Sequence, residues 1–544
     1  MSTELEPGIL PEVVVLGNEA AALAAIHAGV TAAYAYPGTP STELLEYLRR
    51  YRGEHRPRAE WAVNEKTAYE QALGVSMAGR RALVAMKHVG LNVAMDPFVN
   101  SALVSIHGGF VVVVADDPGM HSSQNEQDTR VLAEFAKVPV LEPATQQEVY
   151  DMTREAFERS ERFQVPVLLR LVTRLAHSRA AVTVGAPDVE RPLSKPDDTT
   201  EWTLLPVFAR RQWRRLLRGE EAIRDDAEGS HFNRFEEGDA SLGVITAGVG
   251  RNYLLENLDD LEIRPTRLHV GTYPLPEAAI RDLVARVDRV LVLEDGSPFI
   301  EKKLLGLIPH AVPIQGRLSG HLPLDGELDP DRVRAALGLE PRPGMDLSTF
   351  TAVPRPPRLC QGCPHRDTYA ALHLALEGYE TSLVASDIGC YSLGALPPYG
   401  AIESCVCMGA SIGMAKGAAD AGLHPSVAVI GDSTFFHSGM TAILDAVQAD
   451  TRMTVLILDN SVIAMTGAQE TSHPPTRLEG VLAGLGVPPE HLHVVEAHPR
   501  NVEAIAGILR REIEYDGLSV CVLRRECVES LRRKKQQAAR KAGS

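Results

Sequence analysis

The first 359 residues of the 544-residue chain contain no cysteine, and all seven cysteines lie at or beyond position 360. Secreted proteins held together by disulfides are usually short, with cysteines spread along the whole chain. This distribution therefore argues against a disulfide scaffold. A local group of cysteines in a long chain is more typical of a bound metal or of redox chemistry.

Long hydrophobic runs are also missing. No apolar stretch approaches the ~18–20 residues that a membrane-spanning helix needs. Residues 1–7 are acidic and lack the basic and apolar parts of a secretion signal. We therefore expect a cytoplasmic protein that makes no contact with a membrane.

Positive charge is in deficit, with 55 Lys and Arg against 71 Asp and Glu and a net charge of −16. Such a chain has no overall attraction to nucleic acid, so we expect no nucleic-acid partner. The exception is a basic tail at residues 531–544. It is interpreted as a solvated helix, or as a segment that binds an acidic partner.

Apolar strand-like runs alternate with helical patterns through most of the chain. This alternation predicts an α/β protein of three doubly wound parallel units in series. Proline-rich and charged segments separate the units. The expected divisions are residues 1–185, a linker with an inserted helix at 186–238, 239–345, 355–530 and the tail at 531–544.

Two expected strands of the last unit end in polar residues, Gly431-Asp432-Ser433 and Asp459-Asn460. Because neighbouring parallel strands open ligand sites at their carboxyl ends, Asp432 and Asn460 should reach one sheet edge. Their oxygens suit Mg²⁺ shared with a diphosphate. The spacing resembles the thiamine diphosphate motif, which begins Gly-Asp-Gly and ends Asn-Asn. Ser433 and Asp459 depart from it, and ordinary turn residues are the alternative interpretation.

The cysteine pattern is a Cys-x-x-Cys pair with two later partners, Cys360, Cys363, Cys390 and Cys527. Four thiolates bind either a 4Fe–4S cluster or a structural zinc ion. Zinc sites usually combine two close Cys-x-x-Cys pairs, so this wide spacing favours the cluster. Cys405 and Cys407 are expected to be thiols of the hydrophobic core, although either could replace Cys527 as fourth ligand.

Taken together, eight segments in order resemble the 2-oxoacid:ferredoxin oxidoreductases, most closely the alpha subunits of the indolepyruvate-type members. They are residues 36–42, 63–66, 116–124, 360–366, 387–391, 407–413, 431–437 and 459–467. The resemblance implies a pyrimidine-type thiamin diphosphate-binding domain first and a diphosphate-type domain last. Between them it implies a transketolase C-terminal-like domain at residues 239–345.

The resemblance also implies a role for individual residues. Glu65 would activate the thiamine, although a glutamate there also complements a helix dipole. Thr39 would contact the 2-oxo acid. Asp432, Asn460 and the Val462 carbonyl would bind Mg²⁺. The implied contacts to the cofactor are Gly431, Asp432, Ser433, Cys407, Met408 and Gly409. The implied ligands of a 4Fe–4S cluster are Cys360, Cys363, Cys390 and Cys527. His88, His121 and His437 are additional candidates for acid–base or substrate contacts.

The implied reaction is oxidative decarboxylation of a 2-oxo acid to an acyl-coenzyme A, with electrons passed through the cluster to ferredoxin or another acceptor. A small beta (gamma-domain-like) subunit and a dimer of heterodimers are the implied assembly. Alpha subunits of this family usually continue into a two-cluster ferredoxin-like segment, whereas this chain ends soon after Cys527. Distal clusters are therefore expected on a partner, unless electrons leave from the single cluster. The alternatives are a non-oxidative thiamine diphosphate-dependent decarboxylase or synthase, and an assembly subunit with structural zinc.

Overall fold

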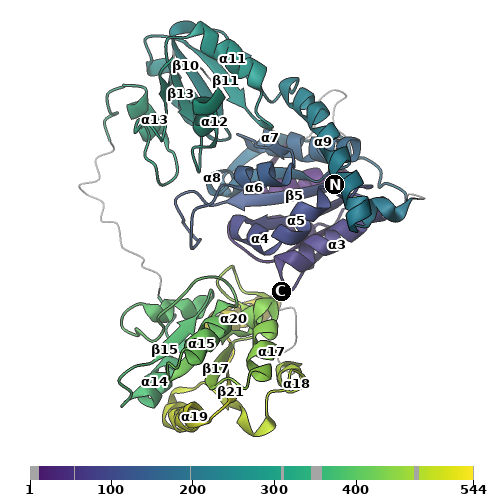
Figure 1. Ribbon diagram of the computed structural model, residues 1–544. Coiled ribbons are helices and arrows are strands. Elements are labelled where there is room, and N and C mark those ends of the chain that lie inside the picture. The colour runs from purple at the N-terminus through teal and green to yellow at the C-terminus, as the bar shows by residue number, and fades with distance from the viewer. Residues whose placement is uncertain are drawn as a thin grey trace. The chain divides into compact units, whose positions relative to one another are not determined.

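The computed structural model describes residues 12–53, 55–195, 198–307, 312–344, 358–470 and 477–542. It divides into two compact units, residues 1–346 and 347–544 (Figure 1). The α/β architecture with mainly parallel sheets that the sequence predicts is confirmed. Among the described residues, no helix is long and apolar enough to cross a membrane.

A seven-stranded sheet forms the centre of the N-terminal unit. Its strands follow the order β12 (Thr272–Tyr273), β6 (Val140–Leu141), β7 (Val167–Val172), β5 (Phe110–Asp116), β4 (Ala82–Lys87), β2 (Ala32–Ala35) and β3 (Arg58–Trp61). All neighbours are parallel except β12 and β6. The carboxyl ends of the six parallel strands therefore point to one edge, where loops collect polar side chains.

Both faces of this sheet are buried. Alternate residues along β4, such as Leu83 and Val84, point to opposite faces and into separate hydrophobic cores. One face packs against α1 (Gly17–His27), α2 (Thr42–Arg50) and α7 (Gln146–Phe163). The other packs against α3 (Glu65–Met77), α4 (His88–Val93), α5 (Met95–Ser101) and α6 (Thr129–Ala136). Burial on both faces explains why these strands read as continuous apolar runs.

A second sheet belongs to the same unit. Its order is β14 (Ile314–Gln315), β13 (Val290–Leu293), β10 (Asp239–Ala247), β11 (Pro265–Val270) and β9 (Arg234–Glu236). The chain segments between and after its strands form four helices, α10 (Gly250–Asn257), α11 (Glu277–Arg286), α12 (Phe299–Leu307) and α13 (Pro330–Ala336). Strand β12 leaves this region and pairs with the first sheet, so the first two expected units form one compact body. The segment expected to hold an inserted helix contains α9 (Pro206–Glu228), which buries Leu216 and Ile223 in the shared core.

Buried charges join the two sheets. Arg170 on β7 lies 2.7 Å from the Asp116 carboxylate and 2.5 Å from that of Glu142. Arg130 on α6 lies 3.0 Å from Glu294, which follows β13 of the second sheet. All five side chains are at most 3% exposed. Charges so buried are tolerated only when paired, so this network fixes how the two sheets sit together.

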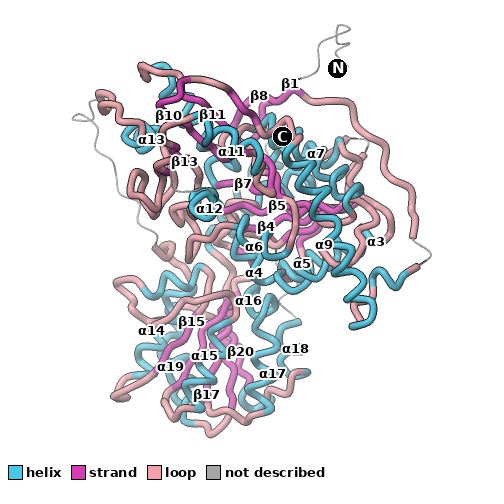
Figure 2. Tube along the Cα trace, turned by 45° about the horizontal axis from the view of Figure 1, so that its top comes forward, coloured by secondary structure: helices cyan, strands magenta, loops and turns pink. Residues whose placement is uncertain are grey.

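The C-terminal unit is built on a fully parallel sheet, β15 (Leu383–Ser386), β16 (Ser426–Gly431), β17 (Met453–Asp459), β21 (Leu518–Arg524) and β20 (Leu492–Glu496). Helices α14 (Pro364–Leu376) and α19 (Val502–Glu514) cover one face. Helices α15 (Ala410–Asp420), α17 (Met440–Gln448) and α18 (Leu478–Gly484) cover the other face. Figure 2 shows the strands of this sheet in magenta among cyan helices. A last helix, α20 (Val528–Ala542), follows β21.

Candidate functional site

Asp432 and Asn460 meet at the carboxyl edge of the C-terminal sheet, as the ends of adjacent parallel strands should. Strand β16 pairs with β17, and Gly431 lies opposite Leu458. The Asp432 carboxylate accepts hydrogen bonds from the backbone N–H groups of Ser433 and Ser461. The loop after β17 is therefore tied directly to the end of β16.

The Asp432 carboxylate is in an environment that favours a cation. Burial, and next the neighbouring Asp459, raise its pKa to about 8. Its Oδ2 atom is buried without a hydrogen-bond partner among the described residues. Such an orphaned oxygen is costly unless a cation or a donor reaches it. One carboxylate with nearby amide and carbonyl oxygens suits Mg²⁺, which typically takes few protein ligands beside a phosphate.

Asn460 is held by contacts on both ends of its amide. Its Oδ1 atom accepts the backbone N–H of Val462 at 3.1 Å, and its Nδ2 lies 3.4 Å from Nε2 of His365. Val462 lies in the short hairpin of β18 (Val462–Ile463) and β19 (Gln469–Glu470). These contacts fix the loop that carries the Asn460 amide and the Val462 carbonyl.

The N-terminus of α15 lies beside this edge. Gly409 caps it with a φ of +84°, and a Cβ there would lie 2.6 Å from the Cβ of Ser438. Only glycine fits both the conformation and the space. Asp387, at the end of β15, accepts the Ser411 backbone N–H at 3.2 Å and its hydroxyl at 2.6 Å. Burial raises the pKa of Asp387 to about 6, although the hydrogen bonds from Ser411 act to lower it. Before the helix, Cys407 is exposed and Met408 is half-buried.

Four cysteines from three parts of the unit line one cavity of about 150 Å³, Cys360, Cys363, Cys390 and Cys527. His365 and Asn460 line the same cavity. Burial, and then the neighbouring thiols, raise the pKa of Cys363 to about 11 and of Cys390 to about 12. Thiolates crowded in this way need a compensating positive centre. The donor set therefore fits an iron–sulfur cluster.

Within the described ranges, no three His, Cys, Asp or Glu side chains converge closely enough to bind one metal ion. A cubane holds its four thiolates further apart than one zinc ion does.

The segment that carries Cys527 is anchored to the rest of the site. The backbone N–H of Cys527 donates to the Asn460 carbonyl at 3.3 Å. Arg525 donates to the Gly362 carbonyl at 2.5 Å and lies 2.8 Å from Asp367. These contacts bring the last strand against the Cys-x-x-Cys loop and the Asn460 loop.

The expectation that Cys405 and Cys407 are core thiols is wrong. Both are exposed, and neither lines the four-cysteine cavity. They lie in the loop that leads to α15 rather than on its packed face, so the small residues around them do not indicate burial. Cys521, on β21, is instead the buried thiol of the core.

In the N-terminal unit, candidate residues follow the strand ends. Thr39 lies in the loop after β2, and its carbonyl accepts the Ser122 hydroxyl at 3.2 Å. Glu65 begins α3, after Asn64 caps that helix by accepting the Thr67 N–H at 2.8 Å. Glu65 is only 5% exposed. Gly90 on α4 faces it so closely that a Cβ would lie 2.7 Å from Oε1 of Glu65.

Lys87 was not singled out from the sequence. Lys87 is the last residue of β4, and a Cβ at Gly38 would lie 3.1 Å from its side-chain carbons. Its ammonium donates a hydrogen bond to the Ser122 carbonyl at 3.1 Å. Burial lowers the pKa of Lys87, opposed by the negative charges of Asp117 and Glu65. A half-buried cation beside Glu65 belongs to the candidate site. The available signal was its position at a strand end next to His88.

The three candidate histidines occupy different environments. His88 is buried at the start of α4, with Nε2 3.1 Å from the Asn125 carbonyl and no partner for Nδ1 among the described residues. His121 is exposed, 3.4 Å from Glu327. His437 is buried beside Ser438 in the π-helical segment Phe435–Gly439.

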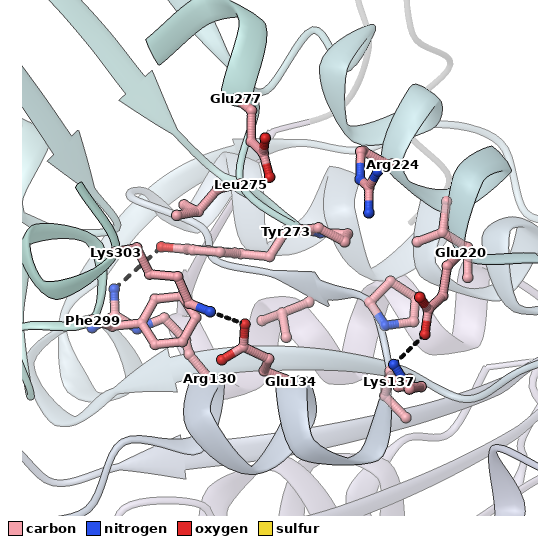
Figure 3. Close-up of a pocket in the computed structure, with 15 residues that line it drawn as sticks. Arg130, Glu134, Lys137, Glu220, Arg224, Tyr273, Leu275, Glu277, Phe299 and Lys303 are labelled. Carbon is pink, nitrogen blue, oxygen red and sulfur yellow. Dashed lines mark hydrogen bonds and ion pairs between the residues drawn. The ribbon is translucent and has the colours of Figure 1, made fainter. Parts of the chain in front are cut away.

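A separate cavity of about 230 Å³ lies between α6, α9 and α12 of the N-terminal unit (Figure 3). Its wall includes the rings of Tyr273 and Phe299, and Lys303 pairs with Glu134 at one side. None of the residues expected from the sequence to bind cofactor or substrate lines it.

Comparison with known proteins agrees with this arrangement. Residues 23–214 match the thiamine diphosphate-binding family of pyruvate flavodoxin/ferredoxin oxidoreductases, and residues 387–522 match the C-terminal TPP-binding domain of thiamine pyrophosphate enzymes. Indolepyruvate oxidoreductase subunit IorA of Archaeoglobus fulgidus is 38% identical over 95% of this chain and 86% of its own length. The Methanothermobacter thermautotrophicus subunit of that name is 37% identical over 95% of this chain and 87% of its own length.

Among solved structures, 2-oxoglutarate:ferredoxin oxidoreductase from Magnetococcus marinus superposes with a TM-score of 0.50 at 19% identity. The match covers 60% of this chain and 65% of that one. At this identity the likeness concerns the fold alone.

Proposed function

The chain belongs to the family of indolepyruvate oxidoreductase IorA subunits, and on that premise we propose that it is the catalytic subunit of a thiamine diphosphate-dependent 2-oxoacid oxidoreductase. A 2-oxo acid, in particular an aryl pyruvate such as indolepyruvate, loses CO₂ and its acyl group passes to coenzyme A. The two electrons released reduce two molecules of ferredoxin, one electron each.

When bound, thiamine diphosphate supplies the carbanion chemistry of decarboxylation and a 4Fe–4S cluster supplies one-electron transfer. In this proposal Asp432, Asn460 and the Val462 carbonyl hold Mg²⁺. Glu65 holds a proton at the aminopyrimidine ring, and Thr39 orients the 2-oxo acid. The burial of Glu65 and the orphaned Oδ2 of Asp432 support these roles.

The proposal depends most on one observation, that Asn460 lines the same cavity as all four cysteines. A decarboxylase needs Asp432 and Asn460 but has no use for four thiols beside them. An oxidoreductase needs its electron acceptor next to the cofactor, because electrons must leave as the acyl group forms.

The proposed assembly contains a small beta (gamma-domain-like) subunit, in a dimer of heterodimers that works in the cytoplasm. The relatives' designation as subunits supports a partner chain.

Iron and acid-labile sulfide per chain, measured on protein purified without oxygen, test the proposal. We expect about four of each for one cluster, and substrate-dependent viologen reduction once the beta subunit is added. Cys527→Ser should lower both contents. Cys405→Ser, an exposed thiol outside the cavity, is the matched control and should leave them unchanged.

Zinc, or no metal, in protein that still binds thiamine diphosphate would refute the electron-transfer step. That result would favour the non-oxidative decarboxylase instead.

A further inference from the structure

Helix α20 begins directly after Cys527 and contributes to the cysteine cavity. The first helical hydrogen bond runs from the Leu531 N–H to the Cys527 carbonyl at 3.0 Å. Arg533 lines the cavity and donates to the Gly467 carbonyl at 2.5 Å. Arg358, on the opposite segment, lines it too and is exposed. Glu529 is the one acidic side chain among the residues that line the cavity, so its rim has two cations against one anion.

Beyond its first turn, α20 buries no face as far as residue 539, the last whose side chain the structure describes. Ser530 is buried, but every residue from Leu531 to Ala539 is exposed. An isolated helix of about 15 residues is marginal in water, and one that is polar all round gains nothing from packing. Its cationic side chains therefore face solvent, where another molecule can reach them.

The charge of α20 is opposite to that of the chain as a whole. Residues 531–539 contain four cations, Arg532, Arg533, Lys534 and Lys535, and no acidic residue. Glu529 pairs with Arg532 and Glu526 with Lys534, so the segment keeps a net positive charge after these two ion pairs. The whole chain has a net charge of −16. A local concentration of positive charge beside the cavity attracts an acidic molecule to that place.

Cys360 shows where electrons could leave. It is the exposed member of the four cysteines, whereas Cys363, Cys390 and Cys527 are half-buried. A carrier seated on α20 and the cationic rim would stand next to the exposed side of the cavity.

We infer that α20 and the adjoining rim of the cysteine cavity form the docking surface for an acidic one-electron carrier protein. This inference rests on the proposed function, because it requires a cluster in the cavity. Each docked carrier takes one electron from the reduced cluster, so two carriers are reduced for every 2-oxo acid oxidised. Electrostatic docking of this kind gives a small, salt-sensitive interface suited to rapid exchange.

The test uses the anaerobically purified holoenzyme with its partner subunit and an acidic ferredoxin that carries a single iron–sulfur cluster. The variant combines Arg532→Gln, Lys534→Gln and Lys535→Gln, and spares Arg533 because it lines the cavity. The control combines Arg210→Gln, Arg214→Gln and Arg218→Gln on α9, three exposed arginines whose loss changes net charge equally. Readouts are the ferredoxin Kd measured by biolayer interferometry, the KM for ferredoxin, and viologen reduction.

At low ionic strength we expect the α20 variant to raise Kd and KM about tenfold and to weaken their dependence on salt. The α9 control should change them less than about twofold, and viologen reduction should stay unchanged in both. An unchanged Kd in the α20 variant, or an equal rise in the control, would overturn the inference.

Two further results are decisive. If wild-type enzyme lacks iron and viologen reduction, the proposed function fails, and the ferredoxin Kd then still reports on docking by itself. If the α20 variant loses binding to vesicles of anionic phospholipid while its ferredoxin Kd is unchanged, the surface serves a membrane and the inference is wrong.

Discussion

The side-chain nitrogen of Asn460 lies 3.4 Å from Nε2 of His365, so one buried histidine connects the proposed Mg²⁺ loop with the Cys-x-x-Cys loop. Burial, and next the charge of Arg525, lower the pKa of His365 to about 4. The ring is therefore neutral near pH 7. Because the Asn460 nitrogen can only donate, Nε2 accepts and the proton sits on Nδ1.

This contact predicts that His365 positions the Asn460 amide. Replacing it by leucine removes the acceptor but keeps an apolar side chain in the buried space. We expect His365→Leu to raise the Mg²⁺ concentration needed for half-maximal thiamine diphosphate binding about tenfold, because supporting contacts of metal ligands typically contribute 10- to 100-fold in affinity. Calorimetric titration of thiamine diphosphate at several Mg²⁺ concentrations measures this.

The control is His373→Leu, an exposed histidine on the same helix, whose Nε2 contacts only the Tyr399 carbonyl at 2.7 Å. Equal Mg²⁺ requirements in the two variants would show that His365 does not orient Asn460.

Gly90 makes a second prediction, about the carboxylate of Glu65. A Cβ at position 90 would lie 2.7 Å from Oε1 of Glu65, so Gly90→Ala must displace that carboxylate. We expect kcat to fall at least about tenfold while the Kd of thiamine diphosphate stays within about twofold, since misplacing a catalytic group by one ångström costs up to 10²-fold.

Gly74→Ala is the matched control, because a Cβ at that helical position on α3 meets nothing within 4 Å. Alanine is favoured over glycine in a helix by about 1 kcal/mol, so neither variant should lower thermal stability through helix propensity. Full activity in Gly90→Ala would remove Glu65 from the proposed mechanism.

The sequence predicts those parts of this site that follow directly from which residues come after a strand. Asp432 and Asn460 follow apolar strands, and the geometry of parallel sheets brings such ends together whatever the rest of the chain does. Lys87 could not be found in this way, since the groups around it, the Asp117 charge and the Gly38 backbone, come from loops that follow other strands. Cys405 has neighbours as small as those of a core thiol, yet it lies in an exposed loop.

The same limit applies to domain boundaries. Strand β12 is two residues long, and its pairing with β6 depends on partners 131 to 133 positions away. No local pattern indicates such a contact. The buried ion pair of Arg130 and Glu294 between the two sheets also joins residues far apart in sequence, so the merging of two expected units into one is visible only in three dimensions.

Arg170 allows a test of that merged unit. Its guanidinium is fully buried between Asp116 and Glu142, and Arg170→Met would leave both carboxylates without it. We expect a loss of about 3–5 kcal/mol in the free energy of unfolding, the usual cost of removing one partner from a buried ion pair. Denaturant unfolding followed by circular dichroism measures the change.

Arg174→Met is the comparison, because Arg174 pairs with Glu327 at 2.6 Å while remaining 44% exposed. An exposed pair contributes about 0–1 kcal/mol, so this variant should unfold almost as the wild type does. Losses of similar size in both variants would mean that the buried network stabilises the unit no more than an exposed ion pair does.

His269 on β11 makes stability depend on pH. Burial lowers its pKa to about 4, its Nδ1 lies 3.0 Å from the Thr246 hydroxyl, and its Nε2 has no hydrogen-bond partner among the described residues. Between pH 6.5 and 4 the unfolded chain binds a proton at this ring that the folded protein does not. Stability therefore falls as pH drops through this window, by up to about 3 kcal/mol from His269 alone.

His269→Leu removes this proton uptake, so the variant should lose less free energy of unfolding between pH 7 and pH 4.5 than the wild type does. Carboxylates that titrate in the same window affect both proteins alike and cancel in the difference. His55→Leu, an exposed position, should retain the wild-type pH dependence. If the two variants show the same slope, the buried ring takes up its proton in the folded protein as easily as in water, and desolvation of His269 is not what lowers its pKa.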